Sequence, residues 1–336
     1  MHVFVAGATG AVGRPLIPRL IAAGHKVTAT TRNRAKADEL RALGADSVVA
    51  DGLDSAAITK AVAEAEPDAI VHQMTALAGK PNLRRFDRWF ATTNELRTKG
   101  TDILLAAARN AGVDRFVAQS YSGWTNPTTG GPVKSEGDGF DPNPPKMQRQ
   151  SLAAIRYLEE TVPAALAHGV VLRYGNFYGP GASDSLIELI RKRQFPVIAD
   201  GAGVWSWTHI EDAASATVTA LEHDANGVYN ITDDEPARVS EWLPYLADAV
   251  GAKRPLRVPV WLARIIAGSV VVRWTTRGRG SSNEKAKREL DWRPTWRTWR
   301  DGFRRGLRDG AASRVEVAGN PVKGVASTSE TREEQS

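Results

Sequence analysis

The sequence predicts an α/β protein built on a doubly wound parallel sheet, with a smaller cap region at its C-terminal side. Three observations predict this fold. Short apolar segments alternate with amphipathic segments of helical period through the first half of the chain. The apolar segments are continuous runs, which is typical of parallel strands covered on both faces. The first run ends directly in a turn with a glycine at every third position.

That turn is the strongest local signal in the chain. An apolar strand at 3–6 leads into Gly7, Gly10 and Gly13, and an amphipathic helix is expected at 11–23. Gly7 allows the turn, Gly10 lets the backbone approach a phosphate, and Gly13 lets the helix pack closely on the strand. The free N–H groups of the helix would then face the anion. We therefore expect a dinucleotide site of Rossmann type, whose phosphate loop also includes Thr9, Ala11 and Val12.

The remaining elements of the first half follow in order. Further strands are expected at 26–30, 47–50, 68–72, 115–119 and 170–172. The helices between them are expected at 35–43, 55–65, 94–111 and 152–168. Ser55 is a suitable N-cap for the second of these helices, and Pro163 should end or kink the last one.

After Gly175 the pattern changes to turn-rich segments with one strand at 227–231 and helices at 240–250, 258–272 and 283–290. We predict a dinucleotide-binding domain at 1–175, a substrate-binding cap at 176–310 with an interleaved boundary, and a disordered tail at 311–336. The loop at 124–147 is rich in Gly and Pro, and a loop of that length is usually functional or mobile.

Composition limits the possible classes. The chain has 336 residues, no cysteine and a net charge of +6. The basic residues are spread among acids, so we expect no nucleic-acid partner, and a cluster between Arg297 and Arg308 reads as a solvated helix face. The longest apolar stretch, 258–272, is too short to span a bilayer and contains Arg264, so no membrane partner is expected. The histidines show no metal-ligand spacing. Met1 leads straight into the first strand, so a cytoplasmic protein is expected.

The residues after the second strand bear on the choice of cofactor. An acid there would bind a ribose 2′-hydroxyl, whereas a base would pair with a 2′-phosphate. This chain has Arg32, which suits a phosphate contact, Arg34 or Lys36 to add charge, and no acid in reach, which favours NADP over NAD. The alternative is that these bases simply face solvent. Further cofactor contacts are expected after the third and fourth strands, from Asp51, Gly52, Leu53, Met74 and Thr75.

Six segments together resemble the extended short-chain dehydrogenase/reductase superfamily, within its NAD-dependent epimerase/dehydratase group. The resemblance runs from residue 1 to about residue 310 and is most specific at 171–181, VLRYGNFYGPG. The other segments are GATGAVG at 7–13, DGLD at 51–54, RFV and QSYS within 115–122, WTHIEDA at 207–213, and KAKRELDWRP at 285–294. The resemblance implies that the segment of Tyr174, Asn176, Phe177 and Tyr178 lines the nicotinamide.

The same resemblance shows a departure. The family places Tyr-x-x-x-Lys at the start of the helix after the fifth strand, where the tyrosine exchanges a proton with the reacting oxygen and the lysine lowers its pKa and holds the ribose. Registered on that motif, the tyrosine position falls on Met147 and the lysine position on Ser151. Neither side chain can take over the original role, so the usual epimerase or dehydratase mechanism is in doubt.

Several residues are candidates for the missing chemistry. Tyr121 follows the fifth strand and is a candidate replacement acid, or else a packed ring beside the nicotinamide. Ser120 and Ser122 are candidates to bind substrate or ribose, and Tyr178 and Lys146 are weaker candidates for the acid. On the substrate side we expect an apolar, planar group, with the alternative that these residues form interdomain core: Trp124, Trp205, Trp207 and His209.

The sequence thus predicts an NADP-dependent oxidoreductase acting on a small, fairly apolar carbonyl or conjugated compound, as a monomer or homodimer. Two alternatives stay open. One is a non-catalytic NADP-binding sensor or partner protein, and the other is a redox-neutral enzyme of the epimerase/dehydratase kind.

Overall fold

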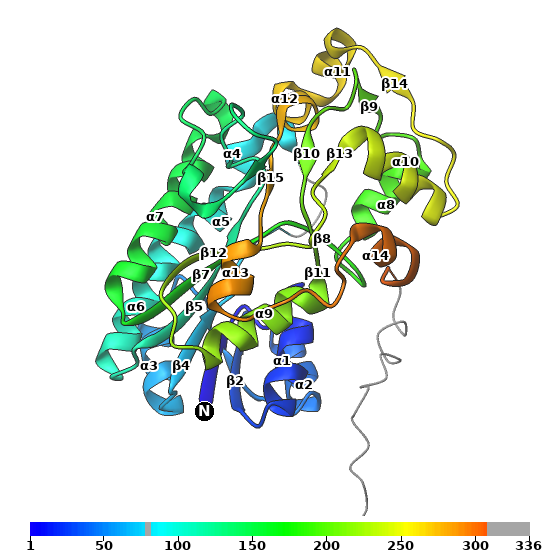
Figure 1. The fold of residues 1–336 in the computed structure, drawn as a ribbon. Helices are drawn as coiled ribbons and strands as arrows, with labels where there is room; N and C mark the ends of the chain where they lie inside the picture. Colours follow the sequence, from blue (N-terminus) through cyan, green and yellow to red (C-terminus); the bar gives the residue numbers. More distant parts are fainter. Residues whose placement is uncertain (78–81, 308–336) are drawn as a thin grey trace, which may run out of the picture.

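A seven-stranded sheet forms the centre of the molecule in a computed structural model that describes residues 1–77 and 82–307 (Figure 1). Its strands run in the order β12-β7-β5-β4-β1-β2-β3, and every neighbouring pair is parallel. The strands are β1 (His2–Ala6), β2 (Lys26–Thr31), β3 (Asp46–Val49), β4 (Ala69–His72), β5 (Arg115–Tyr121), β7 (His168–Tyr174) and β12 (Gly227–Ile231). This is the predicted doubly wound parallel sheet.

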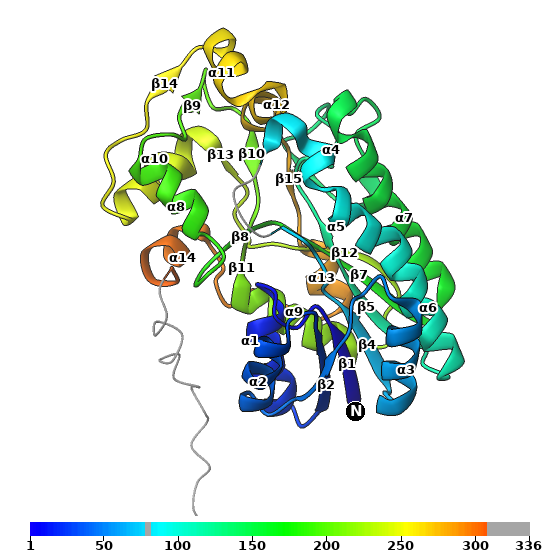
Figure 2. The ribbon, with the colours of Figure 1, turned by 180° about the vertical axis from the view of Figure 1, so that it is seen from behind.

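Helices cover both faces of the sheet, as seen from the two sides in Figures 1 and 2. Along β1, Val3 and Val5 belong to one buried cluster while Phe4 and Ala6 belong to the other. One face packs against α1 (Gly13–Ala22), α2 (Arg34–Ala42), α9 (Ile210–Glu222) and α13 (Glu284–Glu289). The other face packs against α3 (Ser55–Ala65), α6 (Thr101–Asn110) and α7 (Arg149–Ala165). Burial of both faces explains why the strands are apolar at successive positions.

The sheet reverses its strand order between β1 and β4. From β1 the chain proceeds outward to β2 and β3, whereas β4, β5, β7 and β12 lie on the other side. In open α/β sheets a ligand crevice forms at such a switch point, beyond the carboxyl ends of the strands. The glycine turn that follows β1 lies at this point.

The smaller half of the chain extends beyond the carboxyl ends of the strands (Figure 1). Its core is a cluster of aromatic rings that includes Trp205, Trp207, Trp242 and Trp299. Its helices are α8 (Asp184–Arg191), α10 (Val239–Ala249), α11 (Val260–Ala267), α12 (Ser269–Arg277) and α14 (Trp299–Arg305). Its short strands form the pairs β8 (Asn176–Tyr178) with β11 (Trp207–His209), β9 (Val197–Ile198) with β14 (Arg257–Val258), and β10 (Val204–Trp205) with β13 (Ala237–Arg238). Because β12 and α9 return to the main sheet, the two halves interleave.

Two of the predicted helices differ from the structure. The helix expected at 258–272 is two helices, because Gly268 at their junction has a φ of +87°, a conformation that a continuing helix excludes. The helix expected at 94–111 begins earlier, with α4 (Phe86–Trp89) and α5 (Ala91–Glu95), and passes through a π-helical turn at Leu96–Gly100 before α6.

Three smaller expectations also change. Asp54, rather than Ser55, caps α3, because its carboxylate accepts a hydrogen bond from the Ala57 N–H. Pro163 lies inside the last turn of α7 and does not end the helix. The loop at 124–147 contains the strand β6 (Val133–Lys134), which pairs with β15 (Gly280–Ser281) and ties the loop to the cap. The predicted disordered tail and Arg308 fall outside the described residues.

The packing of α1 on the glycine turn generates a stability prediction. A Cβ at Gly13 would lie 2.3 Å from the Ala8 carbonyl oxygen, which is backbone and cannot swing away. We expect Gly13→Ala to lower the free energy of unfolding by about 2 kcal/mol or more, as overpacking of a rigid core does. Urea denaturation measures this. Gly131→Ala is the matched control, since its Cβ would have nothing closer than 3.9 Å, and equal losses in both variants would contradict the prediction.

Candidate functional site: a glycine-lined dinucleotide cleft

The glycine turn after β1 has the geometry of a phosphate-binding loop. Gly7 has a φ of +92°, and a Cβ there would lie 2.6 Å from the Gln73 carbonyl carbon. No side chain caps the start of α1. In its first turn the Arg14 N–H donates to the Gly10 carbonyl and Pro15 has no N–H, so the Gly13 N–H is the group there without a backbone acceptor among the described residues. An uncapped helix N-terminus behind a glycine turn fits the pyrophosphate of a dinucleotide.

A cleft of about 360 Å³ opens from this turn along the switch point. Eight residues predicted to bind the cofactor line it: Gly7, Thr9, Gly10, Ala11, Arg32, Gly52, Met74 and Thr75. Lys36, which the sequence offers as an added charge beside Arg34, also lines the cleft. The other lining residues were not predicted as cofactor contacts: Thr30, Thr31, Ala50, Gln73, Leu77 and Leu96. Val12 and Gly13 do not line the cleft and instead form the start of α1.

One end of the cleft carries positive charge. Arg32 and Lys36 line it, and neither forms an ion pair with any acid in the described part of the chain. Arg34, by contrast, lines a separate groove with Asp38 and Arg41. Asp51 is exposed, and its carboxylate accepts a hydrogen bond from the Leu53 N–H at 3.0 Å, while Leu53 packs against the sheet core.

His72 holds the middle of the cleft together. Its Nδ1 accepts a hydrogen bond from the Met74 N–H at 3.2 Å, and its Nε2 donates to the Leu96 carbonyl at 3.1 Å. Burial is the main cause that lowers the pKa of His72 to about 4, so the ring is neutral at pH 7. It therefore acts as a fixed bridge between two lining segments, the end of β4 and the π-helical turn.

Tyr121, the last residue of β5, does not line this cleft and lies among aromatic rings. Its ring stacks on Trp124 with centroids 6.0 Å apart and meets the edge of Trp274 at 6.4 Å. Its hydroxyl donates to Asn176 Oδ1 at 2.9 Å, and burial raises the pKa of the phenol. Phe177 packs at 5.4 Å against the buried ring of Tyr174. The phenol of Tyr121 is thus a neutral group with its proton directed toward Asn176.

The two predicted serines are already hydrogen-bonded inside the protein. Ser120 donates to Glu159 at 2.6 Å, and Glu159 also forms a buried ion pair with Arg173 from the adjacent strand. Ser122 bonds to Ser281 of β15. Both hydroxyls therefore fasten β5 to its neighbours, and Ser120 belongs to a charged network beneath the cleft.

Met147 and Ser151, at the start of α7, both contact residues of the segment before α6. Met147 packs with Phe86, Phe90 and Trp124. The Ser151 hydroxyl donates to Asp87 at 2.6 Å and accepts a hydrogen bond from the Asn94 amide at 3.1 Å. Lys146 is exposed and forms no ion pair with an acid among the described residues.

Arg97 is a buried cation that sequence reasoning missed. It lies in the π-helical turn beside α7, is 4% exposed, and its Nε and Nη1 have no hydrogen-bond partner. Its guanidinium lies 6.0 Å from the centre of the Phe90 ring. Burial lowers its pKa to about 10, so it stays charged at pH 7. An arginine on an amphipathic helix normally reads as a solvated residue, so the sequence carries no signal of its burial. Gln148, whose side-chain amide nitrogen is also buried without a partner, was missed for the same reason.

Four predicted site residues belong to the core of the cap. Trp205 and Trp207 are buried among other rings, and Trp205 stacks on Trp274 at 4.1 Å. His209 Nε2 bonds to the Gly306 carbonyl at 2.9 Å. The Tyr178 ring packs edge-on against His209 and Phe303. The burial of Trp205 and Trp207 therefore agrees with the alternative that they form core, whereas Trp124 lines a small cavity.

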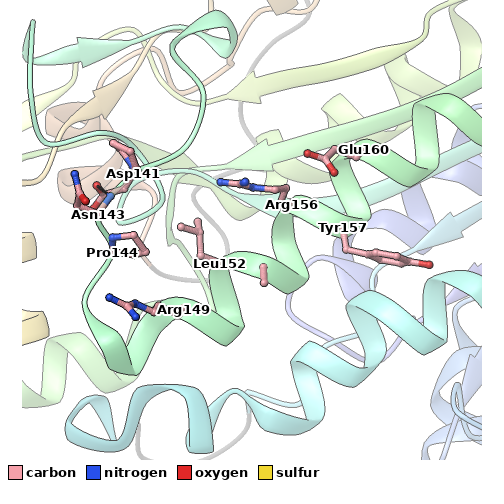
Figure 3. Close-up of a pocket in the computed structure, with 10 residues that line it drawn as sticks. Asp141, Asn143, Pro144, Arg149, Leu152, Arg156, Tyr157 and Glu160 are labelled. Atoms are coloured by element: carbon pink, nitrogen blue, oxygen red, sulfur yellow. Dashed lines mark hydrogen bonds between the residues drawn. The ribbon is translucent and has the colours of Figure 1, made fainter.

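A larger groove lies elsewhere. It has a volume of about 550 Å³ and lies between residues 141–144 and the exposed face of α7. Arg156 extends toward Asp141, whereas the Tyr157 ring points away and its hydroxyl donates to Asp102 (Figure 3). It shares no residue with the dinucleotide cleft. Within 1–77 and 82–307 there is no group of three or more His, Asp or Glu side chains that would hold a metal ion. Nor does any helix in those ranges have the length and apolarity needed to cross a membrane.

Fold and cleft together define a dinucleotide-binding protein of the extended short-chain dehydrogenase/reductase type. The sequence model of the NAD dependent epimerase/dehydratase family matches residues 3–232, and the chain belongs to this family. It is 41% identical to a 3-diazoavenalumate denitrifying reductase from a Streptomyces species, over 91% of this chain and all of that protein. It is 28% identical to a 4-hydroxy-2-methyl-3-oxo-4-farnesyl-3,4-dihydroquinoline-1-oxide ketoreductase from Stigmatella aurantiaca, over 80% of this chain and 79% of that protein.

Solved structures share the fold. A UDP-glucose 4-epimerase from Thermotoga maritima superposes with a TM-score of 0.71 at 21% identity, covering 91% of this chain and 97% of that chain. The UDP-glucose 4-epimerase of Thermus thermophilus superposes with a TM-score of 0.70 at 24% identity, covering 94% and 100%. The family resemblance read from the sequence is therefore confirmed, as is the fold.

The buried network beneath the cleft generates a second prediction. Glu159→Leu would leave the guanidinium of Arg173 buried without its carboxylate, and breaking such a pair costs about 3–5 kcal/mol. We expect the double variant Glu159→Leu/Arg173→Leu to be more stable than Glu159→Leu alone, because it removes the unpaired charge. Urea unfolding of the two single variants and of the double variant measures their free energies of unfolding. The prediction is contradicted if the double variant loses as much free energy of unfolding as the two single variants combined.

Proposed function

We propose that this protein is an NADP-dependent oxidoreductase that reduces a small, fairly apolar carbonyl or conjugated compound without the usual Tyr-x-x-x-Lys pair. The observation that carries the proposal is the cleft itself, with its glycine turn, the uncapped N-terminus of α1 and two unpaired cations at one end. The identity to a reductase over nearly the whole chain supports reduction over a binding role alone.

The preference for NADP rests on Arg32. It follows β2, where a ribose 2′-phosphate would lie, and Lys36 adds a second charge one helical turn later. A guanidinium binds a phosphate through two parallel hydrogen bonds, whereas a ribose hydroxyl would call for an acid at this place. The described residues that line the cleft include no acid.

This assignment predicts a selective loss of affinity. Arg32→Ala should weaken NADPH binding roughly 10- to 100-fold, because it removes one hydrogen-bonded contact between charged groups. NADH binding should stay nearly unchanged. Fluorescence titration of both nucleotides measures it. Arg34→Ala is the matched control, since Arg34 lies in another groove and should leave both affinities intact. Equal losses for NADPH and NADH in Arg32→Ala would refute the phosphate contact.

At the proposed reaction site the Tyr121 phenol lies beside two aromatic rings. The phenol is neutral and lies beside Trp124 and Trp274, so the acceptor would meet planar apolar surface and one hydroxyl. When bound, the reduced cofactor supplies hydride. Tyr121 would then donate a hydrogen bond to the oxygen of a carbonyl, turning away from Asn176 as it does so.

A second class of acceptor is favoured by the 41% identical relative, whose name describes a diazo compound and a reductive loss of nitrogen. Replacing the N₂ of an aryl diazonium ion by hydrogen breaks the carbon–nitrogen bond, releases N₂ and forms a carbon–hydrogen bond with the hydride. This reaction consumes no proton, whereas reduction of a carbonyl needs one at oxygen. A site with Met147 and Ser151 in place of the proton-transfer pair suits it.

One panel of acceptors tests both classes. NADPH oxidation is followed with ketones, aldehydes, enones, imines and an aryl diazonium salt. We expect turnover with at least one class. In Tyr121→Phe, carbonyl reduction should fall about 100-fold or more if the phenol is the acid, while reduction of the diazonium ion should be nearly unchanged. Unchanged carbonyl turnover in this variant would remove Tyr121 from the role.

The alternative is a sensor or scaffold that binds NADP without turning over. It is favoured by the same two positions, Met147 and Ser151, which supply neither a proton nor a charge. Tight binding of NADPH with no oxidation across the panel would favour this alternative over the reductase.

A further inference from the structure

The cap contains a stretch of chain with a one-sided charge. From residue 249 to residue 283 there is no acidic residue, whereas seven are basic: Lys253, Arg254, Arg257, Arg264, Arg273, Arg277 and Arg279. This stretch includes β14, α11 and α12, which lie together at the outer end of the cap (Figure 1). The whole chain has a net charge of only +6, so the positive charge is concentrated here.

Three of these arginines line one groove. The groove has a volume of about 440 Å³ and runs along α11 and α12, with Arg264, Arg273 and Arg277 in its wall. Apolar side chains line it as well, including Val260 and Val272. The lining contains no carboxylate: it is completed by Pro145, Ala199, Ser269 and Thr276. A groove of this size suits a small molecule.

Two of the three arginines have no acid to pair with. Arg273 bonds to Asp141, a buried carboxylate of the loop before α7. Arg264 and Arg277 are exposed and form no ion pair within the described ranges. Because Arg273 is already neutralised, the charge that faces a ligand comes from Arg264 and Arg277. Their guanidinium groups match a carboxylate in shape and charge.

The groove shares one lining residue with the small cavity beside Trp124 and Trp274. Arg273 also lines the narrow cavity that Trp124, Gln148 and Trp274 share, and Pro145 of the groove lies three residues before Gln148. Trp124 and Trp274 are the two rings that contact Tyr121. The shared cavity has a volume of only about 10 Å³, so a ligand in the groove would point toward these rings along one side of α12 without passing through that cavity to Tyr121.

We propose that this groove binds the carboxylate of an aromatic or otherwise conjugated acid, with Arg264 and Arg277 as the anion contacts. The planar body of the acid then extends along the valines toward Trp124 and Trp274. The proposal rests on the proposed function, since it names the substrate class of the same site. It assigns the specificity of the enzyme to charge in the cap rather than to residues of the sheet.

The test compares a charged probe with a neutral probe of the same shape. Isothermal titration of the NADPH-saturated full-length protein is carried out with 2-naphthoate and with 2-naphthamide. We expect the acid to bind at least about tenfold more tightly than the amide, the effect of one hydrogen bond to a charged group. The double variant Arg264→Gln/Arg277→Gln should remove this preference and leave NADPH affinity unchanged.

A matched variant separates a specific contact from the general field of the cap. Arg254→Gln/Arg257→Gln removes two charges from the same stretch that do not line the groove, and it should keep the preference for the acid. The proposal is overturned if the wild type binds neither probe, if it binds both equally, or if the two double variants behave alike. None of these results touches the proposed reductase, which is tested separately by NADPH oxidation across the panel of acceptors.

Discussion

The close contact between Gly7 and the backbone of Gln73 is the constraint on which the cleft depends. With no Cβ in the way, the turn after β1 can lie directly against the chain leaving β4, at the point where the strand order reverses. That approach places the glycine turn that precedes α1 in one cleft with Met74 and Thr75. His72 then fixes the far wall by bridging Met74 and Leu96, and it can do so because burial keeps its ring neutral.

Much of this half of the molecule could be predicted from the sequence, because its signals are local. The glycine turn, the apolar strands and the helix caps act within a few residues, and the parallel order follows from their alternation. The same holds for the phosphate end, where Thr9, Gly10 and Arg32 lie in the cleft as predicted. The predicted helix at 258–272 was wrong because periodicity cannot show that Gly268 adopts a positive φ and divides the segment in two.

The reaction end could not be predicted in this way, because tertiary partners decide what each polar residue does. Ser120 and Ser122 look like free hydroxyls in the sequence, yet one bonds to Glu159 and the other to Ser281, far along the chain. Arg97 looks like a surface residue and is buried, while Trp205 and Trp207 look like ligand contacts and are core. Nothing in the local pattern distinguishes these cases, since burial and pairing are set by elements 30 to 160 residues away.

Met147 and Ser151 each have definite partners in the structure. Met147 is half-buried and packs against the cluster that contains Phe86 and Phe90. A lysine at 151 would pair with Asp87, but it would also share the helix interface with the buried cation of Arg97. The positive charge near this interface thus comes from Arg97 in the π-helical turn, and the remaining phenol, Tyr121, keeps its proton because burial raises its pKa. Under the proposed function such a site would hold an acceptor by planar contact and fixed charge, and we propose that acceptors that need hydride alone suit it best.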